Sequence, residues 1–86
     1  MDYTERIEEI AHLFADLNID YTIQSLYDGA QLRFPWCGGD VACHSGTYGA
    51  NYGNVETMGF PWDNGDVTEL SPIEFVRKLI EYYLSI

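Results

Sequence analysis

Residues 19–34 read Ile-Asp-Tyr-Thr-Ile-Gln-Ser-Leu-Tyr-Asp-Gly-Ala-Gln-Leu-Arg-Phe, and apolar and polar side chains alternate on both sides of the Asp28-Gly29 pair. Alternation with a period of two is typical of a β-strand with one buried face. An Asp-Gly pair between two such runs predicts a two-residue type I′ turn, because both central positions of that turn need a positive φ. The sequence therefore predicts an antiparallel hairpin over residues 19–34.

The position of this turn also predicts the register of the hairpin, since a strand presents alternate side chains to one face. The predicted pairs on the apolar face are Tyr27 with Ala30, Ser25 with Leu32, and Ile23 with Phe34, and Gln24 pairs with Arg33 on the opposite face. A helix packed on the apolar face would cover it.

A helix is predicted before the hairpin, from about Thr4 to Leu17. Apolar residues recur there at spacings of three and four, at Ile7, Ile10, Ala11, Phe14 and Leu17. Asp2 or Thr4 is available as the N-cap. Acidic residues crowd the first turns, where the helix dipole favours negative charge.

A second helix is predicted from Pro72 nearly to the C-terminus. Ser71 as N-cap, Pro72 at the first helical position and Glu74 three residues after the cap form a capping box. The buried stripe expected for this helix consists of Ile73, Val76, Ile80 and Tyr83.

The segment between the hairpin and the second helix is rich in turn formers. Residues 40–44 are predicted as a third strand and residues 54–60 as a fourth, separated by a loop at 45–53, and residues 61–66 form a further cluster of turn formers. The expected fold is α+β: one domain over residues 1–86, in the order α-β-β-β-(β)-α, with an antiparallel sheet and two helices packed on one face.

Charge restricts the partners of this chain. Fourteen Asp and Glu residues against four Lys and Arg give 86 residues a formal charge of −10. Such a field favours positively charged partners and disfavours direct contact with nucleic acid or an anionic membrane. The first residues are acidic where a signal peptide would be basic, so we expect a cytoplasmic protein whose two cysteines are reduced.

Two cysteines and a histidine suggest a structural zinc site. Cys37, Cys43 and His44 lie within eight residues on a glycine-rich segment, and Asp40 and His12 are candidates for the fourth ligand. A small domain with long loops would be stabilised by such a metal. The spacing matches no common zinc finger, and the alternative is a core thiol at Cys43 and an exposed loop thiol at Cys37.

No catalytic residue is expected. Cys43 and His44 are adjacent, but neighbouring side chains of a strand point to opposite faces, so the pair cannot act as nucleophile and base. We expect Cys43 to point inward, as Val41 does.

Two stretches carry a resemblance to known proteins. Residues 39–49, Gly-Asp-Val-Ala-Cys-His-Ser-Gly-Thr-Tyr-Gly, and residues 55–59, Val-Glu-Thr-Met-Gly, resemble small phage and mobile-element proteins of low-GC Gram-positive bacteria. In size, acidity and element order the chain also resembles type II anti-CRISPR proteins, which inhibit RNA-guided Cas nucleases. The resemblance implies a non-enzymatic inhibitor in the bacterial cytoplasm, which occupies a basic surface of a Cas effector and blocks loading of target DNA.

The acidic residues that would contact such a partner form two groups in the sequence. They are Asp63, Asp66 and Glu69 before the second helix, and Glu5, Glu8, Glu9 and Asp16 on the first. Trp62, together with Trp36, Tyr48 and Tyr52, would supply aromatic anchors. The alternative function is a zinc-stapled regulatory or adaptor domain of mobile-element origin.

Overall fold

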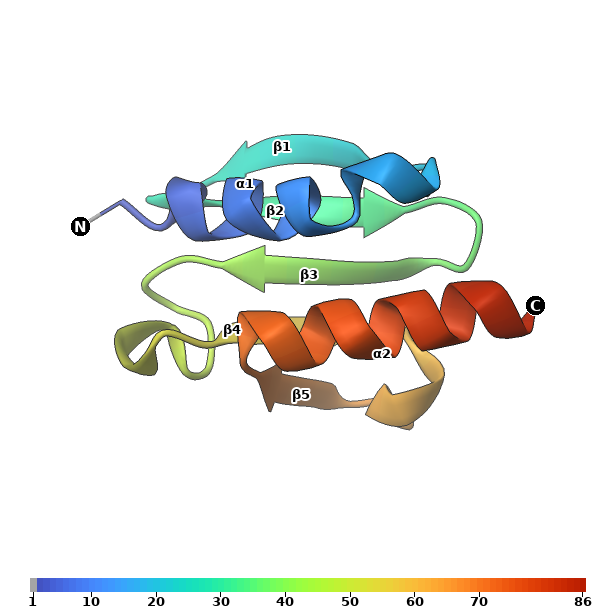
Figure 1. Ribbon diagram of the computed structural model, residues 1–86. Coiled ribbons are helices and arrows are strands. Elements are labelled where there is room, and N and C mark those ends of the chain that lie inside the picture. Colours follow the sequence, from blue (N-terminus) through green and yellow to red (C-terminus); the bar gives the residue numbers. More distant parts are fainter. Residues whose placement is uncertain (1) are drawn as a thin grey trace.

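The computed structural model describes residues 2–86 and contains a five-stranded antiparallel sheet and two α-helices. The elements follow in the order α1 (Thr4–Leu13), β1 (Thr22–Leu26), β2 (Gly29–Phe34), β3 (Gly39–Cys43), β4 (Val55–Met58), β5 (Val67–Leu70) and α2 (Pro72–Ser85). Each strand pairs with the next one along the chain, and both helices lie on the same face of the sheet (Figure 1). The α+β class and the placement of the helices are confirmed.

The core lies between the sheet and the two helices. Its largest fully buried side chains include Phe14, Phe34, Phe75, Ile7, Ile10, Leu32 and Leu79. Phe34 of β2 lies near the centre of this core, because its ring contacts those of Phe14 and Phe75 at centroid distances of 5.9 and 6.3 Å. Within residues 2–86 we find no helix with the length and apolar character to cross a bilayer.

The hairpin is present, but its predicted turn and register are wrong. Leu26 pairs with Gly29, so Tyr27 and Asp28 form the turn, and only Tyr27 has a positive φ, of 57°. The pairs are shifted by two residues from those predicted: Ile23 faces Leu32, Ser25 faces Ala30, Thr22 faces Arg33, and Gln24 faces Gln31. A shift of two keeps the paired strand residues on their predicted faces, although Ile23 is half exposed near the sheet edge. Tyr27, predicted on the apolar face, lies instead in the turn and is 86% exposed.

Gly29 serves a different purpose from the one the Asp-Gly signal suggests. A Cβ atom at this position would lie 1.7 Å from the carbonyl oxygen of Cys43. Glycine is therefore needed because β2 and β3 approach closely here. This approach explains why the turn forms one residue earlier than the dipeptide predicts.

The first helix is shorter than predicted. α1 ends at Leu13, and residues 15–17 form the short 3-10 turn η1 (Ala15–Leu17), which leaves Leu17 partly exposed. Tyr3 occupies the N-cap position, and the Asp2 carboxylate accepts a hydrogen bond from the Thr4 N–H at 2.8 Å. Asn18, in the left-handed conformation, ends this segment.

The sequence prediction missed strand β5. Residues 67–70 pair with β4 in the register Val55 to Leu70 and Met58 to Val67. The third and fourth strands, predicted at 40–44 and 54–60, span 39–43 and 55–58. The predicted loop at 45–53 contains the 3-10 turn η2 (Ala50–Tyr52), and the turn cluster at 61–66 begins with η3 (Pro61–Asp63).

The second helix begins as predicted, but its buried stripe is different. The Ser71 hydroxyl accepts a hydrogen bond from the Glu74 N–H at 3.2 Å, which confirms the cap. The buried residues of α2 are Phe75, Val76 and Leu79, so the prediction is confirmed for Val76. Ile80 and Tyr83 are partly buried against the core, and Ile73 is exposed. α2 carries more apolar residues than one face can bury, so a set of them remains outside the core.

Replacement of Gly29 by Ala should destabilise the protein strongly. The added methyl group would overlap the Cys43 carbonyl, and overpacking against backbone costs about 3 kcal/mol or more. Gly53→Ala is the control, because Gly53 has a φ of 83° and open space around it, so only backbone strain of about 1 kcal/mol is expected. Urea unfolding of both variants measures the difference, and equal unfolding midpoints would contradict the close approach.

Candidate protein-interaction surface

Three exposed tyrosines mark one end of the molecule. Tyr27 lies in the β1–β2 turn, and Tyr48 and Tyr52 lie in the loop His44–Asn54 between β3 and β4; their exposed fractions are 86%, 64% and 84%. We call this end, with Tyr27 and the loop, the tyrosine end. The N-terminus of α1 and the loop containing η2 lie at the same end of the sheet (Figure 1).

Arg6 fixes the shape of the loop. Its Nη1 donates hydrogen bonds to the carbonyl oxygens of Ala50 at 2.8 Å and Asn54 at 3.1 Å, and lies 3.1 Å from the Cys43 sulfur. The guanidinium also stacks over the Tyr3 ring, 5.3 Å from its centroid. Arg6 of α1 thus holds the second half of the loop at its first and last residues, Ala50 and Asn54.

Carboxylates hold the remaining parts of the loop. Asp28 accepts a hydrogen bond from the Ser45 N–H at 2.8 Å, and Glu56 accepts one from the Tyr48 N–H at 2.9 Å. The bond from the Ser45 amide holds the pKa of Asp28 below its ordinary value. The loop is therefore held by side chains of α1, the β1–β2 turn and β4, while the rings of Tyr48 and Tyr52 face solvent.

Glu69 belongs to this same framework. It lies in β5 and not in the turn where it was predicted, and its Oε2 accepts a hydrogen bond from Asn54 Nδ2 at 2.6 Å. Its side chain fills the space beside Gly49, where a Cβ atom would come within 2.4 Å of the carboxylate. Glu69 therefore helps to position the loop.

The chemistry of this end suits a basic protein partner. Residues 45–54 read Ser-Gly-Thr-Tyr-Gly-Ala-Asn-Tyr-Gly-Asn, and tyrosine among Gly, Ser and Asn is the composition of binding loops that combine rigid aromatic contacts with adaptable hydrogen bonds. Aromatic faces and carboxylates together bind guanidinium groups by cation–π contacts and charge-assisted hydrogen bonds. A hollow beside Arg6, lined by Asp2, Glu5 and Glu9, adds negative charge.

The structure does not bring the predicted acidic residues to one surface. Glu5, Glu8, Glu9 and Asp16 are exposed along α1 and η1. α1 begins at the tyrosine end and runs toward the opposite end of the sheet (Figure 1). Asp66 is exposed at the start of β5, where its carboxylate accepts a hydrogen bond from the Val67 N–H at 2.8 Å.

Asp63 cannot contact a partner, because its side chain is buried. Its Oδ1 accepts a hydrogen bond from the Thr57 hydroxyl at 2.8 Å, and its Oδ2 accepts one from the Phe60 N–H at 3.0 Å. The partner role predicted for Asp63 is therefore wrong. This carboxylate accepts the hydrogen bonds of two buried donors that water cannot reach.

Trp62 and Trp36 are half-buried, and Trp62 contributes mainly to packing. The Trp62 ring stacks on Phe60 at a centroid distance of 4.5 Å, and its Nε1 donates to Thr57 Oγ1 at 3.1 Å. Trp36 donates to the Asp20 carbonyl oxygen at 3.0 Å. The exposed anchors of the aromatic set are Tyr48 and Tyr52, and Tyr27 joins them although no sequence signal singled it out.

Replacing Asp63 by Ala should cost about 2–4 kcal/mol of folding free energy, because two buried donors lose their acceptor. Asp66→Ala removes an exposed carboxylate with one backbone contact and should cost about 1 kcal/mol or less. Urea midpoints of the two variants give the comparison. Similar small losses in both would show that Asp63 is not a structural carboxylate.

The candidate zinc ligands do not converge. Cys37 lies in the turn before β3 and Cys43 at the far end of that strand, and five strand residues span about 16 Å. The Cys37 sulfur accepts a hydrogen bond from the Gly39 N–H at 3.4 Å, and His44 Nδ1 accepts one from the Gly46 N–H at 3.0 Å. Across residues 2–86 no three His, Cys, Asp or Glu side chains, His12 and Asp40 included, form a group that could hold a metal.

Cys43 is buried, as the strand pattern predicted. Burial raises the pKa of its thiol above the ordinary value, and the charge of Arg6 opposes this shift without cancelling it. The thiol contacts Arg6, whereas His44 lies against the Tyr27 ring at 5.0 Å. The two side chains therefore have separate partners.

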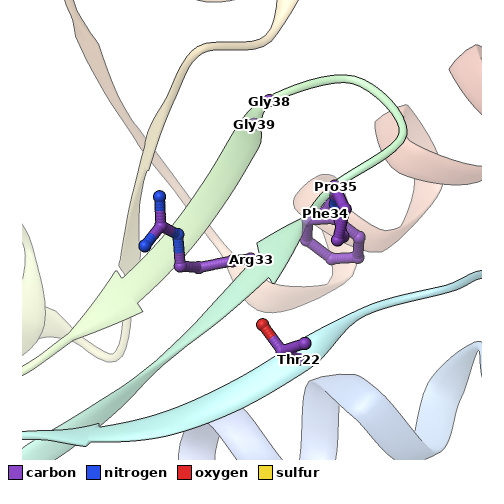
Figure 2. A pocket seen from close by; sticks show the side chains of 6 residues that line it. All are labelled: Thr22, Arg33, Phe34, Pro35, Gly38 and Gly39. Atoms are coloured by element: carbon purple, nitrogen blue, oxygen red, sulfur yellow. The ribbon is translucent and has the colours of Figure 1, made fainter.

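The sheet face without helices carries mixed polar residues. Figure 2 shows the hollow at one end of this face, where the Arg33 side chain extends from β2 toward β3, away from Thr22 of β1. Arg33 lies opposite Asp40 in the register of β2 and β3, and Asp40 is half-buried. Burial raises the pKa of the Asp40 carboxyl, while a contact from Gln31 and the charge of Arg33 lower it by less.

The raised pKa of Asp40 predicts a specific pH dependence. Between the ordinary pKa of 3.8 and the higher folded-state value, the folded protein binds more protons than the unfolded chain, so Asp40 makes stability fall as pH rises through this window. Asp40→Asn should remove that contribution and be at least as stable as the parent at pH 7. Urea unfolding between about pH 4 and 7 tests this, with the exposed Asp20→Asn as control. A loss of stability in Asp40→Asn at pH 7 would contradict the sign.

Comparisons of the chain with protein-family models, with curated proteins and with solved structures found no significant match.

Proposed function

We propose that this protein is a non-enzymatic inhibitor that binds a basic surface of a Cas effector nuclease in the bacterial cytoplasm and prevents target DNA from loading. The observation that carries the proposal is the tyrosine end: two exposed rings on a hydrogen-bonded loop and a third on the β1–β2 turn, with carboxylates around them, in a chain of charge −10. The resemblance to type II anti-CRISPR proteins supports the choice of partner.

The mechanism is competition for arginine and lysine side chains. An RNA-guided nuclease holds nucleic acid in a positively charged channel and reads a short flanking motif with arginines. Carboxylates on a rigid scaffold can pair with these groups in place of phosphates, and the tyrosine rings can stack on guanidinium planes. Because the loop is already ordered by Arg6, little conformational entropy is lost when it binds.

The alternative of a zinc-stapled adaptor has no observation in its favour, since the candidate ligands lie at both ends of β3. The hollow of Figure 2 contains Arg33 as its one ionisable side chain, which gives no support to an enzymatic role.

The experiment combines binding and cleavage. A type II Cas effector loaded with guide RNA is incubated with the protein, and complex formation and cleavage of target DNA are measured at low salt and at about 0.5 M salt. We expect inhibition that weakens with salt, because exposed charges are screened. A protein that neither binds the effector nor slows cleavage at low salt would contradict the proposal.

Matched variants locate the surface. Tyr48→Ala with Tyr52→Ala should weaken binding by about tenfold or more, since aromatic anchors dominate interfaces, and Met58→Ala, exposed at the other end of the sheet, is the control. Glu5→Lys with Glu9→Lys should weaken binding more than Asp16→Lys with Asp20→Lys, although both pairs change the net charge equally. Equal effects of the two charge pairs would exclude the tyrosine end.

A further inference from the structure

The outer side of α2 exposes a second surface with a different chemistry. Ile73, Arg77, Ile80 and Leu84 follow each other at spacings of four and three, so they form one stripe along the helix, with Glu81 beside it. Ile73 and Leu84 are 69% and 71% exposed. We call these five residues the α2 stripe.

A groove runs between this stripe and α1. It is lined by Leu13, Ile73, Val76, Arg77, Ile80 and Glu81, and Leu13 is 53% exposed. A contiguous apolar strip with a few charges at its rim marks an interaction surface. The buried face of α2, with Phe75, Val76 and Leu79, already supports the core, and Ile80 packs partly against it. The exposed apolar area of the stripe therefore comes mainly from Ile73 and Leu84.

Charge identifies the partner that fits this surface. α2 holds two carboxylates and two basic side chains, so its formal charge is zero and the whole charge of −10 lies elsewhere in the chain. The surface around α2 is consequently the one where a second, equally acidic copy meets the least repulsion. We propose that the protein forms a homodimer through antiparallel packing of the α2 stripe.

The order of residues in the stripe is self-complementary under a two-fold axis. When two copies of α2 pack antiparallel about a point between Arg77 and Ile80, Ile73 of one copy lies against Leu84 of the other. The same operation places Arg77 of each copy opposite Ile80 of the other and about 1.5 Å along the helix axis from Glu81. The long Arg77 side chain can therefore reach the Glu81 carboxylate, so every charge in the stripe finds an opposite charge. A parallel arrangement would place like residues together and leave Arg77 against Arg77.

The size of this surface predicts a weak dimer. The 14 residues of α2 span about 21 Å, and one face of such a helix with Leu13 beside it supplies less than the roughly 800 Å² per partner of a standard interface. We therefore expect dissociation in the micromolar range. Because α2 begins at the tyrosine end, the two-fold axis would place the two tyrosine ends at opposite ends of the dimer (Figure 1).

The test is sedimentation equilibrium of the full chain over a concentration series up to about 1 mM, with circular dichroism to confirm folding. We expect a monomer–dimer equilibrium. Arg77→Glu alone and Glu81→Arg alone should each raise the dimer dissociation constant by about tenfold or more, because each places like charges together across the axis. The double variant Arg77→Glu with Glu81→Arg should restore dimerisation.

The control is Glu8→Arg, an exposed residue of α1 that changes the net charge as Glu81→Arg does. A monomer at all concentrations would overturn the proposal. So would a dimer that ignores both single variants, because it would use another surface, and so would a double variant that fails to restore dimerisation. Binding to a Cas effector does not enter this measurement, so its result is independent of the proposed function.

Discussion

The arrangement of the tyrosine end depends on the hydrogen bonds that the Arg6 guanidinium donates. This guanidinium joins α1 to the end of β3 and to two carbonyl groups of the eleven-residue loop His44–Asn54. A loop of this length loses considerable conformational entropy when it becomes ordered, and most of its residues bury little apolar surface. Hydrogen bonds from a charged donor, each worth about 1.5–3 kcal/mol, offset that loss. The exposed tyrosines are held by a polar clamp and not by a hydrophobic core.

With four basic side chains, the protein stabilises many of its carboxylates through backbone amides. Backbone N–H groups donate to Asp2, Asp28, Glu56, Asp63 and Asp66. A carboxylate that accepts such a bond is stabilised in its charged form, and the pKa of Asp28 lies below its ordinary value for this reason. The pKa of Asp2 is lowered first by the Thr4 side chain and then by the Thr4 amide. Backbone N–H groups in turns and at helix ends have no partner within secondary structure. Their partial positive charges therefore stabilise carboxylates for which the chain has too few basic side chains.

Local signals predicted the elements of the fold better than the contacts between them. The Ser71-Pro72 cap and the inward direction of Cys43 follow from propensities within a few residues, and both were predicted correctly. The register of the hairpin was predicted incorrectly, because Gly29 is constrained by the carbonyl group of Cys43, fourteen positions away in the sequence. Asp63 resembles any acidic turn residue in the sequence, and only the neighbouring donors of Thr57 and Phe60 reveal that it is buried. Of the candidate site, Tyr48 and Tyr52 were identified, but Arg6 carries no sequence signal.

The molecule thus divides its surface between two kinds of interaction. The binding proposed at the tyrosine end rests on carboxylates and aromatic rings that attract a cationic partner, and dissolved salt would weaken that attraction by screening. Along the α2 stripe, apolar contact predominates, and the same salt reduces the repulsion between two chains of charge −10. Ionic strength therefore acts in opposite directions on the two surfaces. Arg77 and Lys78, half of the basic residues in the chain, lie on α2 and balance its two carboxylates, whereas the rest of the chain carries the charge of −10.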